Sequence, residues 1–138
     1  MIDDLDPLLE RAGAHASRYL RAQPVRHVGA RADRAELLAG LQVPLSDAGE
    51  PAARVIDALA AQGERGAVAS GSGRYFGFVI GGSYPVAMAA DWLTSAWDQN
   101  AGIHATSPLA AVIEEVAADW MLDLFDLPRE SSVGFVTG

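Results

Sequence analysis

Residues 74–115 constrain the fold more than any other part of the chain, because they combine two glycine-bearing turns with two helix starts. Aromatic and β-branched residues dominate residues 74–80, which predicts an extended, strand-like segment. Gly81 and Gly82 end that segment at a turn. Because most of the aromatic residues lie in this stretch and one of its loops is rich in hydrogen-bonding groups, we expect any function to involve it.

Two helices with the same start signal follow this turn. Ser83 is the predicted N-cap of the first, with Pro85 in its opening turn, and its apolar residues share one face as far as residue 97. Ser107 and Pro108 repeat the signal before a longer apolar stripe that Pro128 ends. Three tryptophans at helical spacings in these segments indicate either a core or a subunit interface: Trp92, Trp97 and Trp120.

Three further helices are predicted before residue 67. Apolar residues recur every three or four positions in residues 2–21, with aspartates near the start and arginines near the end, as the helix dipole favours. Asp33 and Glu36 have the spacing of a capping box and open a short helix, and Pro51 begins a third. The arginine-rich residues 24–31 are interpreted as an extended segment on the surface.

The composition excludes several classes of function. The chain has 138 residues, 50% of them hydrophobic, which is enough for one folded domain. A formal net charge of −8 argues against a nucleic-acid surface, since phosphate binding needs clustered cations. Without cysteine there are no thiolate nucleophiles or disulfides, and without lysine no side-chain amine can form a Schiff base. No apolar run approaches the roughly 20 residues of a membrane span, and we expect a cytoplasmic protein.

Acid–base candidates are few, and none is decisive. His104 lies in the polar loop of residues 98–106, where a lone histidine is more often a surface residue than a catalytic one. Glu114 and Glu115 point about 100° apart on a helix, so they cannot act together on one substrate. No metal-ligand spacing is present. The glycines at 71, 73, 81 and 82 could cradle an anion, but they match no phosphate-loop pattern, and flexible turns are the commoner explanation.

A set of short motifs appears in a fixed order from residue 76 onward. In sequence order these are FGFVIGGSYP at 76–85, ADWL at 90–93, WDQNAG at 97–102, Ser107-Pro108, Glu114-Glu115 and VGFVTG at 133–138. Their combination resembles the N-terminal part of the pyridoxal-phosphate-dependent group II decarboxylases, a family that includes the aromatic amino-acid, histidine and glutamate decarboxylases. The resemblance covers residues 67–138, and the family has the aspartate-aminotransferase-type fold.

The resemblance implies a mostly α chain in three parts. Residues 1–66 would form an N-terminal helical layer that wraps around a second subunit of a homodimer. Residues 67–127 would carry a substrate-entrance turn and two long helices, and residues 128–138 would begin the large α/β domain of a fold-type I pyridoxal-phosphate enzyme. The contacts with an amino-acid substrate would be Phe78, Gly81, Gly82, Ser83, Ile103 and His104, the last two reaching across the dimer, while Thr137 and Gly138 would lie at the edge of the cofactor-phosphate site.

The resemblance also implies what these residues lack. In the family, the Schiff-base lysine and the groups that hold the cofactor ring lie downstream of the position of Gly138, so we expect the chain to continue and to be inactive without that part. Ile80 and Gly81 replace the usual proline and threonine, which argues against an aromatic substrate. Aminotransferase or aldolase-like lyase chemistry stays open, because the same fold supports both. A non-enzymatic helical association module also stays open, since unpartnered apolar helix faces predict self-association.

Overall fold

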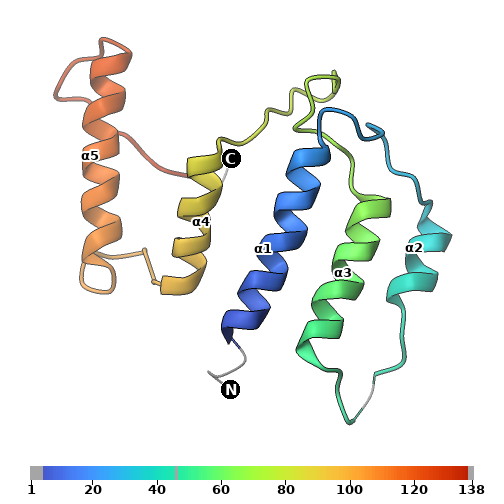
Figure 1. The fold of residues 1–138 in the computed structure, drawn as a ribbon. Coiled ribbons are helices and arrows are strands. Elements are labelled where there is room, and N and C mark those ends of the chain that lie inside the picture. Colours follow the sequence, from blue (N-terminus) through green and yellow to red (C-terminus); the bar gives the residue numbers. More distant parts are fainter. Residues whose placement is uncertain (1–4, 46, 137–138) are drawn as a thin grey trace. The chain divides into compact units, whose positions relative to one another are not determined.

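A computed structural model of the chain describes residues 5–45 and 47–136, and within these ranges it is helical and contains no strand (Figure 1). This confirms the prediction of a mostly α chain. The predicted edge of an α/β domain is not seen in residues 128–136, and Thr137 and Gly138 lie outside the described residues. None of the described helices is long and apolar enough to cross a membrane. The helices are α1 (Leu5–Ala22), α2 (Arg34–Leu41), α3 (Ala52–Gly66), α4 (Pro85–Trp97) and α5 (Pro108–Leu124).

The chain divides into two compact units, Met1–Ser83 with α1 to α3 and Tyr84–Gly138 with α4 and α5. In the first unit, α3 lies between α1 and α2 and packs against both (Figure 1). In the second unit, α4 and α5 run in opposite directions and are joined by the loop after α4, but the two helices do not pack against each other (Figure 1). The second unit therefore has little helix–helix packing of its own.

Two of the three predicted helix caps are confirmed. The Asp33 carboxylate accepts from the Glu36 N–H at 2.9 Å, and the Glu36 carboxylate accepts from the Asp33 N–H at 2.9 Å, which is a complete capping box. Ser107 accepts from a backbone N–H in the first turn of α5. The prediction for Ser83 is wrong, because Tyr84 is the N-cap of α4 and its side chain makes no capping bond. Tyr84 precedes a proline, which favours extended backbone, so it takes the cap position itself.

The first unit is organised by a buried arginine. Arg26 is only 8% exposed, so the prediction that residues 24–31 form a surface segment is wrong at its centre. Its guanidinium donates to the backbone carbonyl of Glu64 at 2.9 Å and lies 3.4 Å from the Glu64 carboxylate. It also stacks over the Tyr19 ring, 4.4 Å from the ring centroid. The Arg26 carbonyl in turn accepts a bond from the Arg74 guanidinium. One residue thus joins α1, the end of α3 and the segment that follows α3.

Backbone bonds complete this junction. The carbonyl of Arg65, in the last turn of α3, accepts from the N–H groups of Arg31 at 2.7 Å and Ala32 at 3.1 Å. The buried Ala69 donates its N–H to the Val28 carbonyl at 2.8 Å. The last carbonyls of a helix have no partner within the helix, and here the segment before α2 satisfies that of Arg65 while the Arg26 side chain satisfies that of Glu64.

A second polar contact holds α1 to α3. The Asp57 carboxylate accepts from Arg11 at 2.8 Å and from the His15 ring nitrogen at 2.9 Å, and these two residues lie one turn apart on α1. The bond from His15, followed by the bond from Arg11, lowers the pKa of the Asp57 carboxyl below its ordinary value. The α1–α3 contact is therefore held in part by a charge that acid removes.

Close approach of α2 to α3 depends on two glycines. A Cβ on Gly40 would overlap the side chain of Gln62, and a Cβ on Gly66 would lie 2.8 Å from Leu37. Both glycines lie in the last turn of their helices. Their role here is to let side chains of the facing helix pack directly on the backbone.

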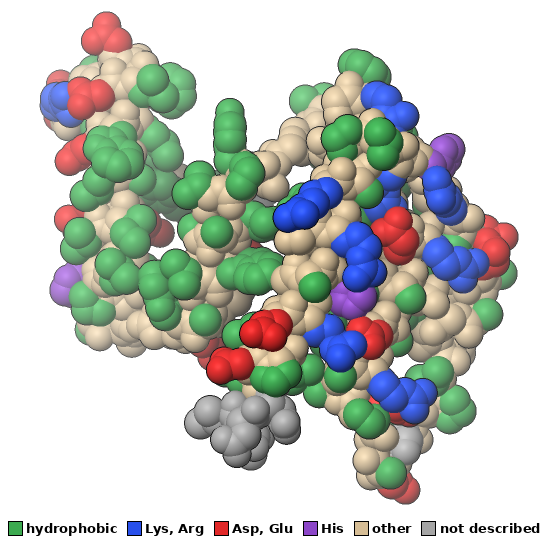
Figure 2. Space-filling view, viewed as in Figure 1, with side chains coloured by type: hydrophobic (Ala, Val, Ile, Leu, Met, Phe, Trp, Pro, Cys, Tyr) green, Lys and Arg blue, Asp and Glu red, His purple; other side chains and the backbone are tan. Residues whose placement is uncertain are grey.

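Little apolar surface is buried in the described chain, where Leu122 of α5 is the only large apolar side chain that is buried. The accessible surface is 11286 Å², whereas a folded monomer of this mass exposes about 6,900 Å² and two separate folded units of these sizes about 8,300 Å². Figure 2 shows apolar side chains gathered over α4 and α5 on the face drawn. The three tryptophans are exposed, so they form no core here, and their place in a subunit interface stays a prediction.

Replacing Asp57 by asparagine should remove one source of acid sensitivity. Because folding lowers the pKa of Asp57, its carboxylate stabilises the fold above the unfolded pKa, and this stabilisation is lost as pH falls through the folded pKa. Urea unfolding between neutral pH and about pH 2 should show a smaller acid-induced loss of unfolding free energy in Asp57→Asn than in the parent. Glu50→Gln is the control, since Glu50 pairs only locally with Arg54. Equal acid losses in Asp57→Asn and the parent would contradict the contact.

Candidate functional site

The segment predicted to be a strand before α4 is instead a tight turn. The Ile80 N–H donates to the Gly77 carbonyl at 3.4 Å, and the two central residues, Phe78 and Val79, have φ values of 55° and 54°. Positive φ at both central positions is the pattern of a type I′ turn, which glycine and asparagine favour. The strand prediction for residues 74–80 is therefore wrong, because a run rich in β-formers holds a turn that lacks the usual turn residues.

This turn is strained and projects apolar side chains. A left-handed backbone costs an L-residue about 1–2 kcal/mol, and a β-branched residue such as Val79 adopts it least readily. Phe78 is 91% exposed, and Phe76 and Val79 are also exposed, so none of the three is held in place by packing within the described chain. Backbone strain of this kind is concentrated at binding sites and switch regions in proteins. The turn is therefore a candidate contact element.

The glycines after the turn are not required by its backbone. Neither Gly81 nor Gly82 has a positive φ, and a Cβ on Gly81 would meet nothing within 4 Å. Both glycines and Ser83 are exposed in the extended segment that leads into α4. Their small size leaves this segment uncovered, which would allow a ligand or a partner to approach the backbone closely.

The polar loop between α4 and α5 is held by its own hydrogen bonds. The Gly102 N–H donates to the Asn100 side-chain oxygen at 3.1 Å. The Thr106 hydroxyl lies 2.7 Å from the Asn100 carbonyl and 3.0 Å from the Ile103 carbonyl. Asp98, at the end of α4, has φ 46° and turns the chain into the loop. The sequence indicated that this loop was more than a connector, but it did not show that Thr106 closes it.

Ile103 and His104 lie on the outside of this closed loop. Ile103 is 62% exposed, and His104 is exposed and makes no hydrogen bond or ion pair with the other described residues. A loop fixed by internal bonds presents such side chains at a lower entropic cost of binding than a mobile loop. Phe78 belongs to the first compact unit, and Ile103 and His104 belong to the second.

The residues present do not fit a covalently held pyridoxal phosphate. The chain has no lysine, and Thr137 and Gly138, the predicted edge of the phosphate site, lie outside the described residues. Arg129, the arginine nearest to them in sequence, is bonded to Asp123. In the described part of the chain, no group of three or more His, Cys, Asp and Glu side chains could hold a metal ion. No chemical step is assigned to this chain through either kind of group.

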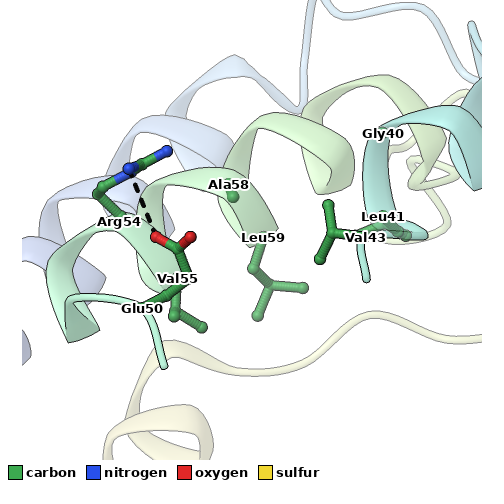
Figure 3. Close-up of a pocket in the computed structure, with 8 residues that line it drawn as sticks. All are labelled: Gly40, Leu41, Val43, Glu50, Arg54, Val55, Ala58 and Leu59. Carbon is green, nitrogen blue, oxygen red and sulfur yellow. Dashed lines mark ion pairs between the residues drawn. The ribbon is translucent and has the colours of Figure 1, made fainter. Parts of the chain in front are cut away.

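A hollow between the end of α2 and one face of α3 was not predicted from the sequence. It has a volume of about 360 Å³, and Figure 3 shows Leu41 and Val43 on one side with Val55 and Leu59 on the other. An ion pair joins Glu50 and Arg54 at its rim (Figure 3). The signal that could have indicated it is the chain reversal around Pro44 with apolar residues on both sides. None of the residues that line the hollow is a predicted site residue.

Strain in the turn can be measured directly at one amide. Val79→Gly removes the Cβ that disfavours positive φ, and after the entropic cost of glycine this should strengthen the Ile80 N–H bond by about 0.5–1 kcal/mol. Hydrogen exchange of the Ile80 amide, followed by NMR, should then slow by about twofold to fivefold. Val79→Ala, which keeps a Cβ, is the matched control and should exchange much as the parent does. Equal slowing in both variants would show that backbone strain is not the cause.

Comparison with known proteins adds no assignment to this geometry. No model of a known protein family matches the chain, and no curated protein matches it. The candidate site is therefore supported by its own residues: a strained turn with Phe78 exposed and a closed loop with Ile103 and His104 exposed. Both elements expose side chains that could contact a ligand or a partner, and neither contains a complete set of catalytic groups.

Proposed function

We propose that this chain is the N-terminal part of a pyridoxal-phosphate-dependent amino-acid decarboxylase that acts as a cytoplasmic homodimer. In this proposal the 138 residues supply subunit contacts and one wall of the substrate pocket, and the cofactor is held by residues of the parent enzyme outside this chain. Removal of the substrate carboxylate as CO₂ would require those residues. The chain's own residues bind and orient the substrate and exclude water from the pocket.

The observation that carries the proposal is the exposure of the residues that the family resemblance marks as substrate contacts. Phe78 is at the tip of a strained turn, and Ile103 and His104 are on a loop closed by its own bonds. Exposed side chains are available to a ligand or a second subunit. Acid–base groups are also scarce among these residues. They therefore fit one wall of a substrate site better than a complete active site.

The large exposed apolar surface supports the expected subunit partner. The tryptophans and most of the leucines are exposed in the described residues, so their apolar faces are available to a partner. In the proposed enzyme, a second subunit and the rest of the parent would cover these faces. The mostly helical fold agrees with the N-terminal layer that the family resemblance implies.

A non-enzymatic association module is the second candidate, and the same exposed helix faces favour it. In that role the chain would bind a partner through α4 and α5 without any cofactor. Another fold-type I reaction, such as transamination or aldol-type cleavage, remains an alternative within the enzyme class, because the residues of this chain do not select the reaction.

The proposal is tested on the protein as the cell makes it. Antibodies against residues 1–138 are used to recover the native protein, which is treated with borohydride to fix any lysine-bound pyridoxal phosphate and then mapped by mass spectrometry. We expect a pyridoxyl-modified lysine on a polypeptide that contains or accompanies this chain. We also expect CO₂ release from at least one amino acid in a panel of acidic, basic, aliphatic and aromatic substrates.

Recombinant 138-residue chain, treated in the same way, is the control and should stay unmodified at every side chain because it has no lysine. Recovery of the chain alone, with no modified lysine, would overturn the enzyme proposal and leave the association module. A modified lysine accompanied by amino transfer without CO₂ release would overturn decarboxylation in favour of the aminotransferase alternative.

A further inference from the structure

The hollow between α2 and α3 has apolar walls that are largely exposed. Its large apolar residues are each 51–71% exposed: Leu41, Val43, Val55 and Leu59. Its volume of about 360 Å³ is within the range of about 300–1,000 Å³ that small-molecule sites have. Every residue that lines it belongs to the first compact unit, so its geometry depends only on α2, α3 and the segment between them. The hollow therefore has the size and the lining for a small apolar group.

The backbone fixes the walls of this hollow. Gly40 lines it at the point where α2 packs on α3, and there is no room for a Cβ at this position. The Val43 N–H donates to the Leu41 carbonyl at 3.0 Å, so the wall continues directly from the end of α2. Gly49 has a φ of 70°, which glycine adopts readily, and it lies directly before Glu50 at the other end of the segment. A ligand would meet a hollow that is already formed, which lowers the cost of binding.

Two opposite charges lie at one end of the hollow, and Figure 3 shows Leu59 between that end and Val43. The charges are the Glu50 carboxylate and the Arg54 guanidinium, whose closest atoms are 3.4 Å apart and whose side chains are 50% and 76% exposed. This distance is longer than the roughly 2.7–2.9 Å of a direct charge-assisted hydrogen bond. A guanidinium has five N–H donors and a carboxylate has two acceptor oxygens, so one ion pair uses only part of their capacity. Both groups can therefore bind a further charge of opposite sign.

We propose that this hollow binds a free α-amino acid with an aliphatic side chain of the size of leucine. The α-carboxylate pairs with Arg54, the α-ammonium pairs with Glu50, and the side chain lies against Val55 and Leu59. A fatty acid would place its carboxylate beside Glu50, and an alkylamine would place its ammonium beside Arg54, so each would meet a like charge. Only a zwitterion matches both charges. The inference does not depend on the proposed function, because none of these residues is a predicted substrate contact.

The test is a titration of the 138-residue chain with L-leucine, followed by NMR. The backbone amides of residues 40–43 and 54–59 should shift and saturate, with a Kd on the order of 1 mM for a ligand this small. Three analogues each lack one part of leucine: glycine lacks the side chain, 4-methylpentanoate lacks the ammonium and 3-methylbutylamine lacks the carboxylate. Each should bind at least about fivefold more weakly than leucine, because each loses one of the three contacts.

Variants assign each charge of the ligand to its partner. Arg54→Gln should raise the leucine Kd at least about fivefold and remove the preference for leucine over 3-methylbutylamine, since the carboxylate has lost its partner. Glu50→Gln should do the same for the preference over 4-methylpentanoate. Ala58→Leu, at an exposed residue that lines the hollow, should fill it and raise the Kd at least about tenfold.

Arg18→Gln is the matched control for the charge changes. Arg18 is an exposed arginine on α1 that does not line this hollow, so its loss should leave the leucine Kd within about twofold of the parent. Circular dichroism verifies that each variant keeps its helices. All the substituted side chains are exposed, so the substitutions should be tolerated.

Three results would overturn the inference. The first is a parent chain whose hollow amides do not shift with leucine. The second is an analogue without the ammonium or without the carboxylate that binds as tightly as leucine, which would show an apolar groove without charge recognition. The third is leucine binding that neither Glu50→Gln nor Arg54→Gln weakens. Each of these leaves the proposed enzyme assignment standing, because that assignment is tested by the modified lysine and by CO₂ release.

Discussion

The guanidinium of Arg26 is the interaction on which the first unit depends. Burying a charge costs several kcal/mol unless bonds replace its hydration, and here a carboxylate, a backbone carbonyl and the face of a tyrosine ring surround it. Those partners belong to α1 and to the end of α3, so the bonds that stabilise the charge also bring the two helices together. The Arg26 carbonyl adds the segment around Arg74 to the same junction. The unit therefore has a polar centre where most domains have an apolar one.

A polar centre leaves the apolar residues free for other contacts. The leucines of α1 and α3 are largely exposed, and in the second unit only Leu122 is a large buried apolar side chain among the described residues. The two candidate contact elements likewise expose their side chains. The turn at Phe78 has a strained backbone, and the loop carrying His104 is closed by Thr106, and both present exposed side chains among the described residues. Such surfaces are suited to a subunit partner.

Much of the helical structure could be predicted from local signals. The capping box at Asp33 and the Ser107 cap are determined by residues three positions apart, so they are visible without tertiary information. Burial of Arg26 could not be predicted, because arginine is usually exposed and its partner Glu64 lies 38 residues away. The strand prediction at Phe78 is wrong for a related reason. Its composition favours a strand, and only the backbone conformation reveals the type I′ geometry.

The predicted roles of the candidate site residues stay predictions. Family resemblance marks Phe78, Ile103 and His104 as contacts, and the structure shows that all three are exposed. The bonds that hold their loops could not be predicted from the sequence. Side-chain bonds to backbone carbonyls depend on loop conformation, which composition does not determine. The hollow between α2 and α3 was missed because it is formed by residues on both sides of a chain reversal.

The unfolding free energy of Arg26→Ala tests the central role of this arginine most directly. Removing the guanidinium breaks its charge-assisted bonds and leaves a carbonyl of α3 without its partner, so urea unfolding should show a loss of about 2–3 kcal/mol. Arg31→Ala, an exposed arginine whose backbone alone joins the junction, should change stability by less than about 0.5 kcal/mol. Equal, small effects of the two substitutions would contradict a fold organised around Arg26.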